Sequence, residues 1–265
     1  MVVREVSGRQ LHEVLGFQEK LQVLETSLKK PLADFKMEVD DAPIFRYLYR
    51  NFSPRRHLEF GTWEGTGVLL CLEECQATVW TMNLLEGELR VDGTWAYGRE
   101  FSDSEAIPEW ARKQTVVESE ATRNYYQTDS RGFIGRHYLE KNLGHRVCQI
   151  YCDSRNWDNS NFPPDFFDTV FIDGGHTKEV VLNDTTKGLA VLRPGGLMLW
   201  HDFYFSDKPF AGGSSSLGVV EAILENLSFL DMHLSDLFWI NPSWILVGVK
   251  KSSLLHTLKQ TLFSR

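Results

Sequence analysis

The sequence predicts an α/β protein with a mostly parallel sheet, and the prediction rests on a strand–helix–strand unit near the middle of the chain. The short β-branched and aromatic run Thr169–Ile172 ends at Asp173 and two glycines, which is typical of a buried parallel strand that opens into a loop. Residues Glu179–Leu192 have the length and apolar spacing of a helix. A second strand, Leu197–Trp200, follows a Pro-Gly-Gly turn and ends at a His-Asp pair.

Four polar residues follow the two strands of this unit. Because parallel strands of one sheet point the same way, their ends should meet at the carboxyl edge, where open α/β sheets place their sites. Each residue alone could instead be a loop former or a helix cap. Two strand ends that carry Asp-x-x-His and His-Asp favour a shared site, formed by Asp173, His176, His201 and Asp202.

The composition is that of an ordinary globular protein of 265 residues and 30.5 kDa, long enough for one large α/β domain with additions. The net charge of −8 argues against a general nucleic-acid surface, since phosphate binding requires clustered Lys and Arg. No stretch approaches the roughly 20 apolar residues that span a bilayer. We therefore expect no membrane contact and a cytoplasmic protein, with core thiols at Cys71, Cys75, Cys148 and Cys152.

We expect residues 1–54 to form an N-terminal helical cap and residues 55–265 to form the main domain. Apolar residues recur at helical spacing from Leu11 to Leu28, which predicts an amphipathic helix. Residues Ala42–Asn51 could form a second short helix, closed by Ser53-Pro54. The first helix could cap the sheet or join two copies of the chain in a homo-oligomer.

A strand, a glycine-rich turn and a helix come next. The strand carries Glu59, the turn contains Gly61, Gly65 and Gly67, and the helical run is Val68–Glu74. In such a turn the first glycine permits a tight bend, and the later ones let a ligand and the helix approach closely. The helix N-terminus offers unpaired amides, so the pattern suits a nucleotide-like ligand. Many α/β proteins use the same turn for packing alone.

The next two strands supply further candidates at their ends. Thr78–Leu84 should be the second strand, and Asn83 stands where nucleotide-binding folds carry the group that contacts ribose hydroxyls. An amide can bond a hydroxyl, although Asn83 could also be a turn former. Val147–Tyr151 should be the third strand, and it leads into Asp153-Ser154.

The segment Gly87–Gly144 is long for a connection within a compact sheet and is rich in aromatic residues, so we expect an inserted lid or substrate wall. Within it, Pro108–Glu120 could be helical. Toward the C-terminus, Leu217–Leu227 should form a helix. Two strands, His233–Ile240 and Trp244–Val249, should then pair antiparallel across the turn at Asn241-Pro242.

These residues together resemble a class I S-adenosylmethionine-dependent methyltransferase, from about Leu58 to Val249. The stretch Glu59–Gly67 resembles the family's first motif, which cradles the methionine part of the cofactor. Phe171–His176, with the later Arg-Pro-Gly-Gly and Trp-His-Asp, is similar to a bacterial subgroup that includes metal-dependent O-methyltransferases acting on natural-product sugars. The resemblance implies a Rossmann-like seven-stranded sheet, mostly parallel with an antiparallel last strand, and helices on both faces.

The resemblance also implies roles for single residues. Asp173 and Asp202 match ligands of a divalent metal, Mg²⁺ or Mn²⁺, and His176 matches the base that removes the hydroxyl proton. His201 departs from the usual oxygen donor, and an imidazole ligand would shift the preference toward Mn²⁺, Fe²⁺ or Zn²⁺. The residues expected to contact S-adenosylmethionine are Glu59, Gly61, Thr62, Gly65, Gly67, Asn83, Asp153, Ser154 and Asp173.

Three functions follow from these patterns. The first is metal-assisted O-methylation of a hydroxyl on a small molecule or sugar. The second is a metal-independent methyltransferase in which His176 or His201 works alone. The third is a nucleotide-cofactor-binding protein such as a dehydrogenase, against which the glycine spacing of Gly61, Gly65 and Gly67 argues, because it matches methyltransferases rather than dinucleotide-binding proteins.

Overall fold

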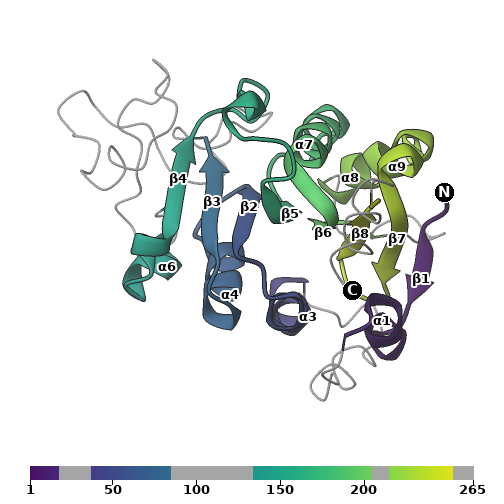
Figure 1. Cartoon of the computed structure of the whole chain (residues 1–265), viewed down its shortest axis with the longest axis horizontal. Helices are drawn as coiled ribbons and strands as arrows, with labels where there is room; N and C mark the ends of the chain where they lie inside the picture. The colour runs from purple at the N-terminus through teal and green to yellow at the C-terminus, as the bar shows by residue number, and fades with distance from the viewer. Residues whose placement is uncertain (18–36, 85–133, 205–214, 253–265) are drawn as a thin grey trace, which may run out of the picture.

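The computed structural model describes residues 1–17, 37–84, 134–204 and 215–252, and they form a single sheet with helices on both faces (Figure 1). The strands are β1 Arg4–Val6, β2 Arg56–Phe60, β3 Thr78–Asn83, β4 Val147–Tyr151, β5 Phe167–Ile172, β6 Leu192–Trp200, β7 Leu234–Ile240 and β8 Leu246–Lys250. The helices are α1 Gly8–Leu15, α3 Met37–Phe52, α4 Thr66–Glu74, α6 Arg136–Glu140, α7 Lys178–Val191, α8 Ser215–Leu224 and α9 Leu227–His233, with 3₁₀ turns η2 Gly144–Arg146 and η3 Asn159–Asn161.

The strand order is β1-β7-β8-β6-β5-β2-β3-β4, and β8 alone among these described strands runs antiparallel to its neighbours. The predicted α/β fold with a mostly parallel sheet is therefore confirmed, as is the antiparallel pairing of the last two strands. The predicted count of seven strands is wrong, because the described residues form eight. The additional strand, β1, extends the free edge of β7, and its three residues are too few to show a strand periodicity in the sequence.

The N-terminal region differs from its prediction in two ways. The helix expected to begin at Leu11 begins at Gly8, where Ser7 and Gln10 form a capping box, and it ends at Leu15 because Gly16 adopts φ 65°. Residues 18–28 of the predicted helix lie outside the described residues. The second predicted helix, α3, is longer than expected and covers Met37–Phe52. Residues 1–54 also contribute β1, so this segment is not purely helical.

Two apolar cores lie on the two faces of the sheet. Leu58 and Phe60 of β2 point to the face covered by α7 and α8. The alternate residues His57 and Glu59 point to the opposite face, beneath α3 and α4, where an apolar cluster includes Phe171. Figure 1 shows this division, with α7, α8 and α9 on one side of the strands and α3 and α4 on the other. The sheet thus holds polar side chains of β2 inside the second core.

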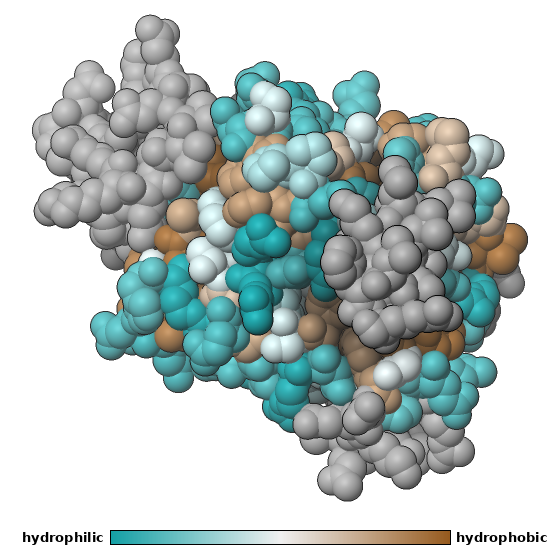
Figure 2. All heavy atoms as spheres, in the orientation of Figure 1, coloured by the Kyte–Doolittle hydropathy of each residue, from teal (hydrophilic) through white to brown (hydrophobic). Residues whose placement is uncertain are grey.

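The C-terminal helix prediction is wrong in one respect. The single helix expected over Leu217–Leu227 is two helices, α8 and α9, separated at Glu225-Asn226. Figure 2 shows polar side chains over the centre of the described surface. Among the described helices, none has the length and apolar character needed to cross a bilayer.

Residues 85–133, which include most of the predicted lid and Pro108–Glu120, lie outside the described residues.

Candidate active site

Backbone hydrogen bonds fix the strand ends that were predicted to meet. The Asp173 N–H donates to the Phe60 carbonyl at 2.8 Å, and the His201 N–H donates to the Ile172 carbonyl at 3.1 Å. The register of β5 and β6 pairs Ile172 with Trp200, so the next residues on both strands emerge side by side. The ends of β2, β5 and β6 are therefore held as one edge, and the side chains that follow them share a small volume.

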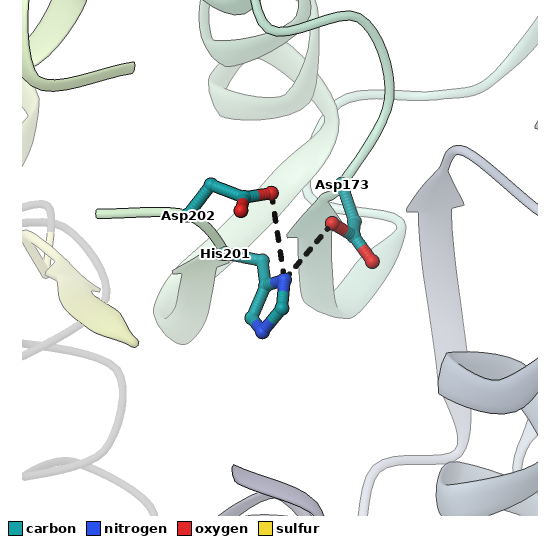
Figure 3. Close-up of side chains that lie close together, drawn as sticks. All are labelled: Asp173, His201 and Asp202. Carbon is teal, nitrogen blue, oxygen red and sulfur yellow. Dashed lines mark ion pairs between the residues drawn. The ribbon is translucent and has the colours of Figure 1, made fainter. Parts of the chain in front are cut away.

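The structure brings Asp173, His201 and Asp202 together at this edge (Figure 3). His201 Nδ1 lies 3.2 Å from Asp173 Oδ1 and 3.5 Å from Asp202 Oδ2. Both carboxylates turn toward the same ring nitrogen, and the three ligand atoms lie within 4.8 Å of one another. His201 and Asp202 are buried, whereas the Asp173 side chain is 31% exposed. One side of the group is thus open to a ligand.

His176 joins this group through Asp202. Its Nε2 lies 2.8 Å from Asp202 Oδ2, and its side chain is 34% exposed. Asp202 itself adopts φ 56°, a left-handed conformation that Asp tolerates better than most residues. We call Asp173, His176, His201 and Asp202 the carboxyl-edge cluster.

One member of the site was missed in the sequence. Asp41, on α3, places Oδ2 at 3.0 Å from His201 Nε2, and its side chain is 1% exposed. The Trp244 N–H donates to the other oxygen, Oδ1, at 3.3 Å. A signal was present, because Asp41 shares the i, i+4, i+7 face of α3 with the buried Phe45 and Leu48. An acid on an otherwise apolar helix face must find a buried partner.

The charges of the cluster support one another. Burial alone would lower the pKa of His201, but the charge of Asp173 and hydrogen bonds to the surrounding carboxylates hold that pKa well above its usual value. Burial would raise the pKa of Asp202, yet hydrogen bonds from His176 and His201 outweigh it and hold the pKa of Asp202 below its usual value. Burial raises the pKa of Asp41, against the opposing hydrogen bond from His201. The three surrounding carboxyl groups therefore favour the charged form of His201.

The glycine-rich loop touches this cluster through Gly61. Gly61 has φ 101°, and a Cβ at this position would lie 2.1 Å from the Asp173 carbonyl oxygen. Only glycine fits there, because a side chain would meet backbone that cannot move without disturbing the strand ends. The predicted cofactor loop and the carboxyl-edge cluster are thus in direct backbone contact.

The other two glycines of the loop are explained by packing against the protein. A Cβ at Gly65, which has φ 85°, would lie 2.7 Å from the ring of Tyr138. A Cβ at Gly67 would lie 2.9 Å from both carboxyl oxygens of Glu59. The sequence-based expectation was that these glycines let a ligand approach. The structure gives each an internal neighbour instead, and their contact with a cofactor stays a prediction.

Glu59 acts as a cap for α4. The N-cap residue Gly65 has no side chain to offer, and the Glu59 carboxylate accepts a hydrogen bond from the Val68 N–H, in the first turn of the helix. Burial, and next the charge of Asp173, raise the pKa of Glu59 well above its usual value. Beside it, burial lowers the pKa of His57 to about 3, so that ring is neutral. His57 and Glu59 thus form a buried pair under the loop, with His57 Nε2 3.6 Å from Glu59 Oε2.

Thr62 and Asn83 are also used inside the protein. The Thr62 hydroxyl lies 2.8 Å from the Thr81 hydroxyl and accepts a hydrogen bond from Gln149 Nε2 at 2.8 Å. The Asn83 side-chain oxygen accepts from the Trp63 N–H at 2.9 Å, and its amide donates to the Leu84 carbonyl at 2.7 Å. Both side chains are buried and shape the loop. Their predicted cofactor contacts would have to be added to these bonds.

Asp153 and Ser154 lie in the loop that follows β4. The Arg155 guanidinium donates to Asp153 at 2.6 Å and holds the pKa of that carboxyl below its usual value. The Ser154 hydroxyl bonds Asp184 of α7, whose pKa burial raises to about 6. The Lys187 ammonium donates to the Ser154 carbonyl at 2.7 Å. This loop is therefore fastened to α7, with Asp153 facing the surface.

Comparison with known proteins agrees with the fold. A family model described as a methyltransferase domain matches residues 58–203, more than half of the chain. The SAH-bound methyltransferase from Podospora anserina superimposes with a TM-score of 0.52 at 13% identity, over 92% of this chain and 94% of that one. An O-methyltransferase of tomaymycin synthesis from Streptomyces achromogenes, in complex with SAM, gives a TM-score of 0.47 at 15% identity, over 92% and 96%. No curated protein matches the chain by sequence.

Proposed function

Because the chain belongs to the methyltransferase domain family, we propose that it methylates a hydroxyl oxygen of a small molecule or sugar at the carboxyl-edge cluster. Membership of the family confirms the predicted methyltransferase class, and in this proposal the methyl donor is S-adenosylmethionine. The observation that carries the proposal is the contact of Gly61 with the Asp173 carbonyl, which sets the cofactor loop against the cluster. A donor held at the loop would thus have its reactive end beside an acidic, partly exposed group of side chains.

In this proposal the cofactor lies along the loop from Gly61 to Gly67. Apart from the Val68 N–H, which donates to Glu59, the first-turn amides of α4 have no intrahelical partner and favour the carboxylate of the methionine part. S-adenosylmethionine supplies a methyl group on a positively charged sulfur, which leaves as a neutral thioether once the acceptor oxygen bonds the methyl carbon. The loop contributes by holding the donor in line with the acceptor, and such positioning lowers a barrier by several kcal/mol.

The acceptor hydroxyl must lose its proton as its oxygen bonds the methyl carbon. His176 is the proposed acceptor of that proton, at Nδ1, because its Nε2 already faces Asp202 at 2.8 Å. Asp202 would then stabilise the imidazolium that forms, as a carboxylate does in a His–Asp pair. The partial exposure of His176 and Asp173 leaves room for the acceptor beside them.

The same edge fits a divalent cation. Asp173 Oδ1, His201 Nδ1 and Asp202 Oδ2 offer two oxygens and one nitrogen within 4.8 Å, a donor set that suits Mn²⁺, Fe²⁺ or Zn²⁺ better than Mg²⁺. A cation there would lower the pKa of a hydroxyl placed beside it.

The alternative is the metal-independent mechanism. In it His201, which lies 3.2 Å from Asp173 and 3.0 Å from Asp41, would supply positive charge between these carboxyl groups when its ring is protonated. Exhaustive chelation separates the two mechanisms: full methyl transfer without metal supports the imidazolium, and transfer restored only by added Mn²⁺ or Mg²⁺ supports the metal.

Acceptor recognition is assigned to the segment Gly87–Gly144, and its described end supports that role. The Gly135 N–H donates to the Trp63 carbonyl at 2.8 Å, and Arg136 Nη2 donates to Glu64 at 3.0 Å. The segment therefore returns to the sheet by way of the cofactor loop. Replacing part of it should alter acceptor choice while S-adenosylmethionine affinity stays within about threefold, and loss of that affinity would instead make it a cofactor lid.

The function is tested by following transfer from labelled S-adenosylmethionine to matched panels of small acceptors bearing hydroxyl, amine or thiol groups. The proposal expects product with hydroxyl acceptors, including sugars and phenols, and its loss in Asp173→Asn. Calorimetry with S-adenosylmethionine on the same variant measures how much of that loss comes from donor binding. Transfer confined to amines or thiols, or undiminished in Asp173→Asn, would contradict the assignment to this cluster.

A further inference from the structure

His201 meets carboxyl groups on both of its ring nitrogens, and the two sides differ. On the Nδ1 side lie Asp173 and Asp202, which belong to the carboxyl-edge cluster. On the Nε2 side the described residues place one carboxyl group, that of Asp41 at 3.0 Å, on a helix that contributes no other member of the cluster. The ring is buried, with Phe45 and Phe171 packed at centroid distances of 5.7 Å and 6.3 Å, so it cannot turn over without displacing them.

We propose that Asp41 is a positioning residue that keeps a hydrogen on His201 Nε2 and so presents Nδ1 to Asp173 and Asp202. A carboxylate only accepts hydrogen bonds, so the nitrogen that faces Asp41 must be the donor. Nδ1 is then the atom that serves the reaction, as a donor to the two carboxylates or as a lone-pair ligand of a cation. Outer carboxylates fix metal-binding histidines in this way. The inference rests on the proposed function only in giving His201 Nδ1 a place in the site.

The backbone of Trp244 makes this arrangement testable. Its N–H donates to Asp41 Oδ1, so that position requires an oxygen. In Asp41→Asn the amide oxygen must stay there, and the amide NH₂ must then face His201 Nε2. Two donors cannot face each other, so Nε2 gives up its hydrogen and the ring keeps one on Nδ1. An Asp-to-Asn change that reverses a histidine tautomer has a known precedent in a Ser-His-Asp triad.

The experiment is ¹⁵N NMR of the full chain labelled at histidine, with Zn²⁺ alone as the probe cation and no donor or acceptor present. Wild-type His201 should show a protonated Nε2 both with and without Zn²⁺. Asp41→Asn should show an unprotonated Nε2 and bind Zn²⁺ about 10–100-fold more weakly. Asp184→Asn, a change at a buried carboxyl on α7, should leave the His201 signals unchanged and Zn²⁺ affinity within about threefold.

An unprotonated Nε2 in the wild type, or a retained Nε2 hydrogen in Asp41→Asn, would overturn the proposal. Should Asp41→Asn fail to fold, the wild-type spectra decide alone, because an Nε2 that lacks hydrogen or loses it to Zn²⁺ excludes the role of Asp41. The NMR spectra of His201 do not depend on methyl transfer. A protein that methylates nothing in the acceptor panels can still show the expected spectra, so failure here and failure of the proposed function are distinguishable.

Discussion

The ends of β5 and β6 and the ends of β2 and β3 carry equally polar residues, but the protein uses them differently. Asp173 and Asp202, at the ends of β5 and β6, face a shared histidine and border an open side. At the other two ends, Thr62 and Asn83 bond to neighbouring residues of the loop and sheet and are buried. The polar residues after β5 and β6 thus meet other titratable side chains, which favours a chemical role, whereas Thr62 and Asn83 bond uncharged groups and shape the loop.

The largest effect is expected for a substitution in the carboxyl-edge cluster. His176→Ala removes the proposed proton acceptor, so turnover should fall by a factor of about 10²–10⁴, up to about 5 kcal/mol of barrier. S-adenosylmethionine binding should stay within about threefold by calorimetry. The matched control is His145→Ala, at an exposed histidine that is not part of the carboxyl-edge cluster. Equal turnover in the two variants would remove His176 from the mechanism.

Next in size is the contact that joins the two regions. Gly61→Ala should cost about 2–5 kcal/mol of unfolding free energy, from a left-handed backbone and an overlap with the Asp173 carbonyl. Urea unfolding measures the loss. Gly16→Ala, at φ 65° with open space around it, isolates the backbone part and should cost only about 1–2 kcal/mol. Similar losses at both glycines would show that the close approach to Asp173 is not tight.

Asp184 of α7, which bonds Ser154 in the loop after β4, extends the comparison to a buried acid that has no proposed chemical role. The pKa of Asp184 is raised from 3.8 to about 6, so the folded state favours the protonated form. That contribution to stability is complete below about pH 4 and is lost as pH rises through 6, a difference of about 2–3 kcal/mol.

Asp184→Asn cannot ionise and should escape this loss. It should be more stable than the wild type by about 2–3 kcal/mol at pH 8 and differ by less than about 1 kcal/mol at pH 4.5. Urea unfolding at the two pH values tests the sign. A stability difference that does not change with pH would contradict the raised pKa.

The smallest effect is expected under the glycine loop. Because the pKa of Glu59 is raised well above its usual value, Glu59→Gln should change stability and S-adenosylmethionine affinity by less than about 1 kcal/mol. Glu59→Ala removes the acceptor of the Val68 N–H and should cost about 2–4 kcal/mol, including the cavity. Calorimetry and urea unfolding on both variants separate charge from shape. A large loss in Glu59→Gln would mean that the carboxylate charge matters at this strand end too.

The sequence was most informative where one local pattern decides the structure. The run that contains β5, α7 and β6 has strand, helix and turn signals in order, and chain direction alone brings Asp173 and His201 to one edge. The glycine spacing at Gly61 likewise predicted the loop and, through the family resemblance, the enzyme class. Gly16 also carried a clear stop signal for α1, which the apolar repeat running past it concealed.

The rest depended on contacts between distant segments. The apolar face of α3 marks Asp41 as a buried acid, but only the packing of α3 on the sheet brings it to His201, and no local pattern identifies that partner. The internal use of Thr62 and Asn83 depends on which neighbours the register supplies, as Gln149 of β4 does for Thr62. The strand β1 has three residues and gains its structure from β7. Register and helix packing are global properties, so a single sequence leaves them open.

Asp202→Asn tests the central claim most directly, that the carboxyl-edge cluster does the chemistry while the loop holds the donor. Asn tolerates the left-handed backbone at φ 56°, so the change removes charge without adding backbone strain. S-adenosylmethionine affinity and methyl transfer to a hydroxyl acceptor identified in the panel are measured on the same preparation. The account predicts affinity within about threefold of the wild type and turnover reduced by about 10²-fold or more. Unchanged turnover, or affinity lost in parallel with turnover, would contradict it.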